Sequence, residues 1–383
     1  MRIAIVTHKL LHNYGGALQA YALQKTLKDM GHVPIGIDCM PYQIGRTRYL
    51  LSNLKTLCYR LIGKTGRNWY RFPIEKRNTF FEDFYNSHLT LTPICRKYRY
   101  GILKRIEAEA VIVGSDQVWR SSFHPDRNLY MDMFLKFALR FNGLKIAYAA
   151  SFGTDCLEIP KREEMYLCRL ASKFNAISTR EESGVKLCKR HLKVDALHIC
   201  DPTILLERSD YISLTEHTEI MDYMFAYILD IEPMIVNTVE KIAKELGNPI
   251  LVESAENSAN ISVEKWLGLI EDATAMITNS FHGLVFAIMS HTPFVVIAHK
   301  ERGEERLYSL LNSLGLSERI VDNVAYIKSC MLRETDIDWE NIDRKFGKMR
   351  IAGKRFLQEA LLGKNTEEIN QILLREALIE PYK

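Results

Sequence analysis

The sequence contains no apolar run that approaches membrane-spanning length, and no apolar leader precedes its first regular element. Hydrophobic residues make up 47% of the 383 residues, but charged residues, 26% of the chain, interrupt them throughout. Residues 2–7 (RIAIVT) already have the pattern of a buried strand. The sequence therefore argues against a membrane-spanning or exported chain, and we expect a cytoplasmic protein.

Cysteine pairs and strong charge are also missing. The eight cysteines are scattered without a CxxC motif, which favours reduced thiols. Cys188, His191, His198 and Cys200 lie close in sequence, but their spacing fits no familiar zinc pattern, so we expect no metal site. A net charge of +4 is too small to indicate nucleic-acid binding.

Neither GxGxxG nor GxxxxGK[ST] occurs, which excludes the usual dinucleotide fingerprint and the P-loop. Strands and helices nevertheless alternate along most of the chain, and this alternation predicts parallel sheets. The length suits two domains. We predict two Rossmann-like α/β domains that face each other across a ligand cleft, over residues 1–203 and 204–340, with residues 341–383 forming helices that cross back to the first domain.

Polar loops follow two strands of the first predicted domain. One loop follows residues 2–7, and the other follows the strand 110–113; both lie at the carboxyl edge, where α/β sheets bind ligands. Asp116 could accept a proton from a hydroxyl group, and Trp119 could stack on a sugar ring. The alternatives are a tight glycine turn in the first loop, and in the second an Asx turn beside a partly buried Trp119. The candidate residues for binding an acceptor substrate are Asn13, Tyr14, Gly15, Gly16, Ser115, Asp116, Gln117 and Trp119.

A strand-to-helix turn in the second half of the sequence is the main candidate for an active site. The strand 275–278 precedes Asn279 and Ser280, both good N-cap residues, and a buried helix follows. Such a turn directs unpaired backbone N–H groups at its ligand, so anions bind there. His282 adds a titratable proton donor, although a buried core histidine is the alternative.

Residues 44–87 have a different composition. Cations are interleaved with leucines and aromatic residues, which suits contact with an anionic membrane surface; a helical insertion packed on the domain is the alternative. The cations are Arg46, Arg48, Lys55, Arg60, Lys64, Arg67, Arg71, Lys76 and Arg77.

Four motifs in order resemble the polysaccharide pyruvyl transferase family, from about Ile3 to the region 310–316. They are NYGGALQAYAL at 13–23, GSDQVW at 114–119, REES at 180–183 and TNSFHG at 278–283. The resemblance implies a GT-B-like enzyme that transfers the enolpyruvyl group of phosphoenolpyruvate onto two hydroxyls of a sugar, in a polysaccharide or its lipid-linked precursor, and releases phosphate. It places the donor in the C-terminal domain and the acceptor in the N-terminal one.

The resemblance also implies roles for individual residues. Ser280, Phe281 and His282 match the donor-binding turn, although relatives carry an arginine where Ser280 stands. Lys300, Arg302 or Arg306 would then supply the missing charge, and Arg180 matches a second anion-binding arginine.

A chemical scheme follows from these residues. We expect His282 to protonate the donor and Asp116 to take the hydroxyl proton, with no metal and no cofactor besides the donor substrate. The alternative is a GT-B glycosyltransferase using a sugar nucleotide, with Glu304 or Glu305 at the ribose; a third reading is a non-catalytic anion-binding protein.

Overall fold

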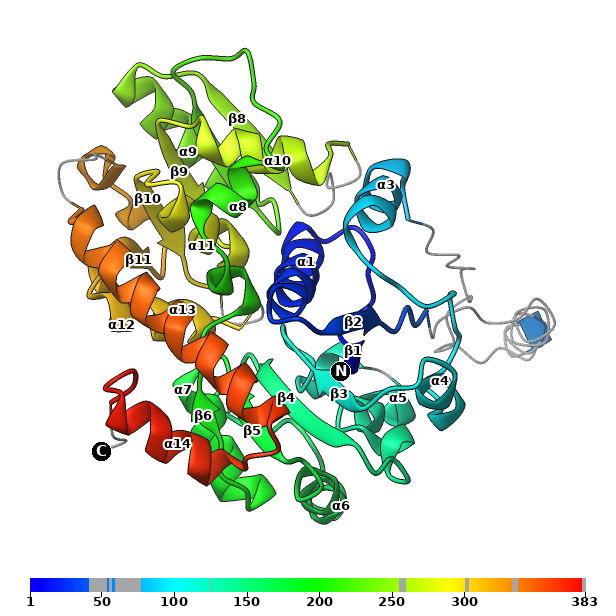
Figure 1. The fold of residues 1–383 in the computed structure, drawn as a ribbon. Coiled ribbons are helices and arrows are strands. Elements are labelled where there is room, and N and C mark those ends of the chain that lie inside the picture. The colour runs from blue at the N-terminus through cyan, green and yellow to red at the C-terminus, as the bar shows by residue number, and fades with distance from the viewer. Residues whose placement is uncertain are drawn as a thin grey trace.

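The computed structural model describes residues 1–40, 54, 57–58, 77–124, 126–254, 260–299, 303–332 and 337–380. Within these residues the chain forms two α/β domains, each built on one parallel sheet (Figure 1). This architecture confirms the predicted fold class. None of the helices in the described ranges combines the length and the apolar character needed to cross a membrane.

The first domain has a six-stranded sheet in the order β2-β1-β3-β4-β5-β6. Neighbouring strands of this sheet pair in parallel, and alternate residues of β1 reach different core clusters on its two faces. Burial on both faces explains why these strands are short runs of Val, Ile and Ala. The strands are β1 (Arg2–Val6), β2 (Val33–Gly36), β3 (Ala110–Val113), β4 (Leu144–Ala150), β5 (Ala176–Thr179) and β6 (Leu197–His198).

The second domain has a five-stranded parallel sheet in the order β11-β10-β9-β7-β8. The chain passes from the first sheet to the second through Asp201 and Pro202, after β6 has ended. The strands are β7 (Met224–Ile228), β8 (Ile250–Ser254), β9 (Ala275–Thr278), β10 (Phe294–Ile297) and β11 (Ile320–Val321).

Helices cover both faces of each sheet. The first domain carries α1 (Tyr14–Asp29), α3 (Thr79–His88), α4 (Tyr100–Arg105), α5 (Arg127–Asp132), α6 (Lys161–Ala171) and α7 (Glu182–Leu187). The second carries α8 (Arg208–Ile212), α9 (Pro233–Leu246), α10 (Val263–Glu271), α11 (Phe281–Met289) and α12 (Glu305–Leu314).

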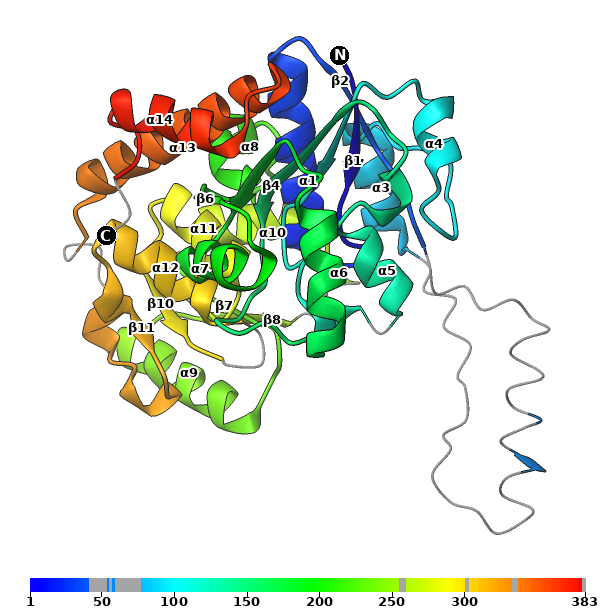
Figure 2. The same ribbon diagram turned by 90° about the horizontal axis from the view of Figure 1, so that it is seen from below.

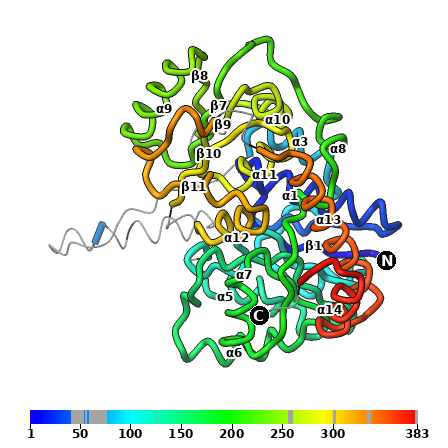
Figure 3. The backbone as a smooth tube through the Cα atoms, turned by 90° about the vertical axis from the view of Figure 1, so that its left-hand side faces the viewer, coloured from blue at the N-terminus to red at the C-terminus, as the bar shows by residue number. Residues whose placement is uncertain are grey.

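The two C-terminal helices, α13 (Trp339–Leu361) and α14 (Thr366–Arg375), join the domains. The start of α13 packs Ile342 and Phe346 into a cluster that includes the second-domain helices, whereas Phe356 lies against the first sheet. Figures 1 and 3 show α13 running along both domains, and Figure 2 shows α5 and α6 on the opposite face of the first sheet from α13 and α14. This long helix therefore fixes one domain against the other.

Helix α1 forms another contact between the domains. Its Tyr14 ring stacks on Trp266 of α10, with ring centroids 5.1 Å apart, and its hydroxyl donates to the Ile261 carbonyl at 3.1 Å. Both rings belong to a hydrophobic cluster that continues from the first domain into the second. Burying this apolar area stabilises the closed arrangement of the two domains.

Several sequence predictions lie outside the described residues. They include Lys300 and Arg302, and most of the basic segment 44–87: its described part comprises Leu54, Leu57, Cys58 and residues 77–87. Arg77, the last cation of that segment, is buried and pairs with Asp38 at 2.6 Å. Membrane contact by the segment stays a prediction from sequence.

Candidate active site

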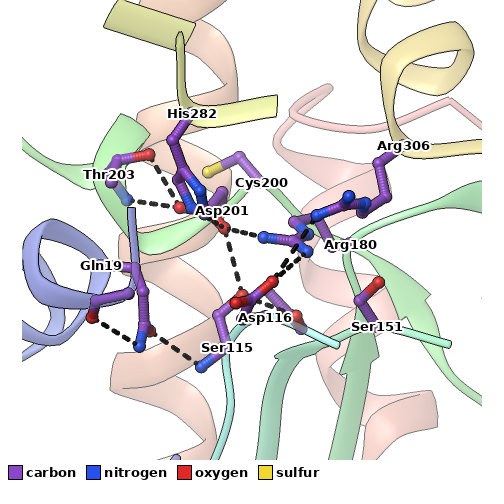
Figure 4. Close-up of polar contacts among 12 residues, drawn as sticks. Gln19, Ser115, Asp116, Ser151, Arg180, Cys200, Asp201, Thr203, His282 and Arg306 are labelled. Atoms are coloured by element: carbon purple, nitrogen blue, oxygen red, sulfur yellow. Dashed lines mark hydrogen bonds and ion pairs between the residues drawn. The ribbon is translucent and has the colours of Figure 1, made fainter. Parts of the chain in front are cut away.

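The carboxyl ends of strands from both sheets meet around a buried group of ionic side chains (Figure 4). Asp116 follows β3, Arg180 follows β5, Asp201 follows β6, and His282 lies just after β9. Parallel strands bring their carboxyl ends to one edge, so residues far apart in sequence become neighbours. The edge of each domain thus supplies part of one site.

The second-domain side is the beginning of α11. Ser280 is its N-cap and accepts a hydrogen bond from the Gly283 N–H at 3.2 Å. Thr278 accepts from the Ser280 N–H, and Asn279 accepts from the Leu229 N–H, which together fix the turn. The turn holds His282 in the second helical position, where only 6% of the residue is exposed. Sequence predicted this local geometry correctly.

His282 also contacts the first domain. A Cβ atom built on Gly15 would overlap the His282 ring, so a glycine is required for the two domains to approach here. Gly15 lies in the first turn of α1, whose N-cap Asn13 accepts from the Gly16 N–H at 3.0 Å. The N-terminal ends of two helices therefore converge on the imidazole, and both favour a nearby anion.

Arg180 connects two carboxylates of the first domain. Its Nη1 lies 2.6 Å from Asp201 Oδ2 and its Nη2 lies 3.0 Å from Asp116 Oδ1. The guanidinium also lies over the Phe281 ring, 4.5 Å from the centroid. Burial opposes the charged form of Arg180, but the two carboxylates outweigh it and raise its pKa. All three side chains are nearly inaccessible to solvent.

Asp201 is the site residue that the sequence analysis missed. Its Oδ1 caps the following turn by accepting from the Thr203 N–H and hydroxyl, and its Oδ2 accepts from the Ser115 hydroxyl at 3.2 Å. The same oxygen lies 3.7 Å from His282 Nε2, which is ion-pair distance but longer than a hydrogen bond. Asp201 lies three residues beyond the two-residue strand β6 (Leu197–His198), and the sequence analysis placed it only near the end of the first predicted domain.

The two aspartates are held ionised. Burial alone would raise their pKa values, but Arg180 and the nearby histidines hold the pKa of Asp116 and of Asp201 well below the usual range. A carboxylate with such a low proton affinity is a weak base. In the structure Asp116 is an ion-pair partner of Arg180 and Arg306, and its role as a proton acceptor stays a prediction.

Arg306 is the second arginine of the site. It begins the first turn of α12, donates from Nε to the Gly303 carbonyl at 3.2 Å, and places Nη1 3.6 Å from Asp116. It also lies over Phe281, 5.4 Å from the ring centroid. Burial and the repulsion from Arg180 lower its pKa to about 10. Two guanidinium groups thus share one aromatic ring and one carboxylate, an arrangement that an added anion would stabilise.

Two stacked histidines lie behind Asp116. The rings of His8 and His124 are nearly parallel, with centroids 5.0 Å apart, and His124 Nε2 lies 3.0 Å from the Val118 carbonyl. Burial lowers the pKa of His8, although the Asp116 carboxylate opposes this shift. Burial and the neighbouring His8 lower the pKa of His124 to about 3. Sequence gave no indication of this pair.

Several predicted acceptor residues have structural roles instead. Trp119 is 1% exposed, and its ring stacks on Phe134 in the core of the first domain, so it offers no face to a sugar. Tyr14 is covered by the second domain, as described above. Ser115 donates to the Ala149 carbonyl, and Gln117 accepts from Arg120 at 2.9 Å. Of the predicted acceptor set, Asn13 is exposed and Gly16 is partly exposed, whereas Asp116 is buried in the ionic cluster.

A comparison with known protein families identifies the family of this chain. A family model described as polysaccharide pyruvyl transferase matches residues 13–301, which contain all four sequence motifs and every site residue named above except His8 and Arg306. The chain belongs to the polysaccharide pyruvyl transferase family. A comparison with curated proteins gave no match.

Solved structures agree on the architecture. The chain is similar to the UDP-GlcNAc 2-epimerase of Neisseria meningitidis bound to UDP-GlcNAc, with 12% identity and a TM-score of 0.51 over 94% of this chain and 100% of that chain. It is also similar to the spinosyn forosaminyltransferase SpnP, with 12% identity and a TM-score of 0.41 over 99% and 100% of the two chains. Together with the two facing parallel sheets, the first likeness shows a GT-B-like fold.

Proposed function

We propose that this pyruvyl transferase uses phosphoenolpyruvate as its donor and joins the enolpyruvyl carbon to two hydroxyls of a sugar, with release of phosphate. The observation that carries the proposal is a set of buried nitrogen atoms around the start of α11. Arg180 Nε, Asn279 Nδ2 and His282 Nε2 are buried without a hydrogen-bond partner among the described residues. Buried donors of this kind cost free energy unless a ligand satisfies them.

The donor offers the matching chemistry. Phosphoenolpyruvate carries a carboxylate and a phosphate, which suit guanidinium groups and helix N-termini. We place these groups between Arg306, Arg180 and the start of α11, with the three-carbon unit against Phe281. The ion pair of Arg306 with Asp116 spans 3.6 Å, whereas the two ion pairs of Arg180 span 2.6 Å and 3.0 Å, so the Arg306 pair would yield to a donor anion more readily.

The reaction then proceeds by proton transfer and addition. His282 gives a proton to the terminal carbon of the donor, which becomes a methyl group, and the first sugar hydroxyl adds to the central carbon. Phosphate leaves with the electron pair of its C–O bond, and the second hydroxyl closes the ketal. One of the two hydroxyl protons returns to His282, and the other leaves on phosphate.

The weak basicity of Asp116 is compatible with this order of events. A hydroxyl proton becomes strongly acidic once its oxygen has bonded to the electron-poor central carbon, so a weak base suffices to take it. Asp116 can relay that proton to the departing phosphate. Asp201, close to His282 Nε2, is a positioning residue for the imidazole.

The reaction is tested by measuring free phosphate and the acceptor mass together. Phosphate release that requires both phosphoenolpyruvate and a sugar, with a ketal-bearing product, supports the proposal. Release of nucleotide from a sugar nucleotide, with no phosphate from phosphoenolpyruvate, would instead support the glycosyltransferase alternative.

Donor binding has its own test in Arg306→Gln. Losing a charge-assisted hydrogen bond should weaken binding of phosphoenolpyruvate by about 1.5–3 kcal/mol, measured by calorimetry. Arg319→Gln is the matched control, because this buried arginine donates to the Phe294 and Met331 carbonyls in the second domain. Unchanged donor affinity in Arg306→Gln would remove Arg306 from the donor site.

A further inference from the structure

A cavity of about 790 Å³ lies between the candidate active site and helix α13. Its inner wall includes Arg180, Asp201 and Phe281, so it is continuous with the ionic cluster. Its outer wall is formed by α13, which contributes Arg344, Lys345 and Lys348. This volume falls within the range of about 300–1,000 Å³ that small-molecule sites occupy. The cavity therefore has room for a ligand that reaches the reactive cluster from α13.

The charges of the outer wall are not balanced. No carboxylate of the described part of the chain forms an ion pair with Arg344, Lys345 or Lys348, and Lys345 donates to the Leu314 carbonyl. Two carboxylates of the lining are already paired, Glu182 with Lys186 and Asp201 with Arg180.

Glu380 is the remaining acidic residue of the lining, to which α13 contributes three cations. Arg344 and Lys348 are four residues apart and so lie on one face of α13. The outer end of the cavity thus favours a ligand group with more than one negative charge. These residues lie beyond the range 13–301 that the family model matches, so the family assignment gives them no role.

We propose that Arg344, Lys345 and Lys348 bind a phosphate or diphosphate group on the acceptor, and so direct its sugar toward Arg180, Asp201 and His282. The assignment of this ligand as the acceptor rests on the proposed function. The apolar lining between the two ends, including Ile199, Ile204 and Leu310, suits the less polar faces of a sugar ring. Diphosphate esters of a nucleotide and of a lipid carrier share this chemistry.

The anion site is tested with inorganic pyrophosphate. In calorimetry, Arg344→Gln/Lys348→Gln should weaken pyrophosphate binding tenfold or more, with and without saturating phosphoenolpyruvate. Lys354→Gln is the matched control, because Lys354 lies on the same helix but does not line the cavity, and it should bind as the parent does. Equal affinity in the double variant and the parent protein overturns the proposal.

This measurement needs no donor and no turnover. A protein that fails to bind phosphoenolpyruvate but loses pyrophosphate binding in the double variant would refute the proposed function while supporting the anion site. The acceptor assignment is tested by displacement of pyrophosphate, with a sugar nucleotide in one arm and a short-chain polyprenyl diphosphate sugar in the other. Displacement in either arm supports the acceptor assignment and identifies the source of the diphosphate. Displacement in neither arm overturns the assignment.

Discussion

The two domains differ in how completely the polar side chains at their site edges are hydrogen-bonded. On the first domain, Asp116, Arg180 and Asp201 satisfy one another through two ion pairs, and Ser115 and Thr203 complete the bonding of Asp201. On the second domain, His282 Nε2 and Asn279 Nδ2 are buried without a hydrogen-bond partner among the described residues. The polar groups of the first edge are therefore mostly paired with one another, with Arg180 Nε left for a ligand, whereas the second edge depends more on a ligand to satisfy its buried groups.

This difference predicts that substitutions on the two edges affect different properties of the protein. Removing one partner of a buried ionic network leaves an uncompensated charge, whereas removing a group from an unsatisfied edge costs folding little. Changes on the first edge should thus act mainly on the free energy of unfolding, and changes on the second should act mainly on turnover.

The largest effect is expected for Arg180→Ala. This change leaves the Asp116 and Asp201 carboxylates buried without their shared cation, which should lower the free energy of unfolding by about 3–5 kcal/mol. Urea denaturation followed by circular dichroism measures it. Arg127→Ala is the control, since Arg127 makes an exposed pair with Glu163 worth about 0–1 kcal/mol. A similarly small loss in both variants would contradict the interpretation of the first edge as a stabilising ionic network.

On the second edge, His282→Ala should lower turnover by about 100-fold or more and leave unfolding nearly unchanged. His282→Gln refines the test, because glutamine can donate a hydrogen bond but cannot transfer a proton. Phosphate release under single-turnover conditions gives the rate. Turnover in the glutamine variant equal to that of the parent would remove His282 from the acid role.

The sequence predicted the second edge better than the first. The cap, the histidine and the strand before them are consecutive residues, so local rules for strand-to-helix turns located Ser280 and His282. The network of the first edge joins Asp116, Arg180 and Asp201, which only the sheet order brings together. Asp201 was missed for this reason, and because the two-residue strand β6 before it was not predicted.

Trp119 shows a second limit of sequence reasoning. An aromatic residue in a polar loop has the same sequence pattern whether its ring faces solvent or the core. Here Phe134, Phe152 and Phe174 surround the ring, and its Nε1–H donates to the Met133 carbonyl. These partners come from three other segments, so burial could not be read from neighbouring residues.

A smaller effect on turnover is expected for Gly15→Ala. Gly15 belongs to the first domain and packs against His282 of the second. The added methyl group overlaps the His282 ring and must displace it or separate the domains. A displacement of about 1 Å can cost up to about 100-fold in rate, so the loss should approach but not exceed that of His282→Ala. Gly101→Ala is the control, because a methyl group there meets no other atom. Parental turnover in Gly15→Ala would show that the contact with α1 does not position the imidazole.

The stacked histidines of the first edge should have an effect that is confined to acidic pH. The pKa of His124 is lowered to about 3 in the folded protein, against about 6.5 in an unfolded chain. Between these values the unfolded state binds one more proton at this residue, so stability is retained above pH 6.5 and falls as the pH drops toward 3. His124 should contribute about 1.4 kcal/mol of lost stability per pH unit across this window.

His124→Gln removes that titration, so its free energy of unfolding should depend less steeply on pH than that of the parent between pH 6 and 4. Urea denaturation of both proteins through the same pH series measures the two slopes. His8, which stacks on His124 and also has a lowered pKa, should leave part of the slope in the variant. Identical slopes would mean that His124 is not held neutral by burial, and that its titration does not contribute to the acid sensitivity of the protein in this range.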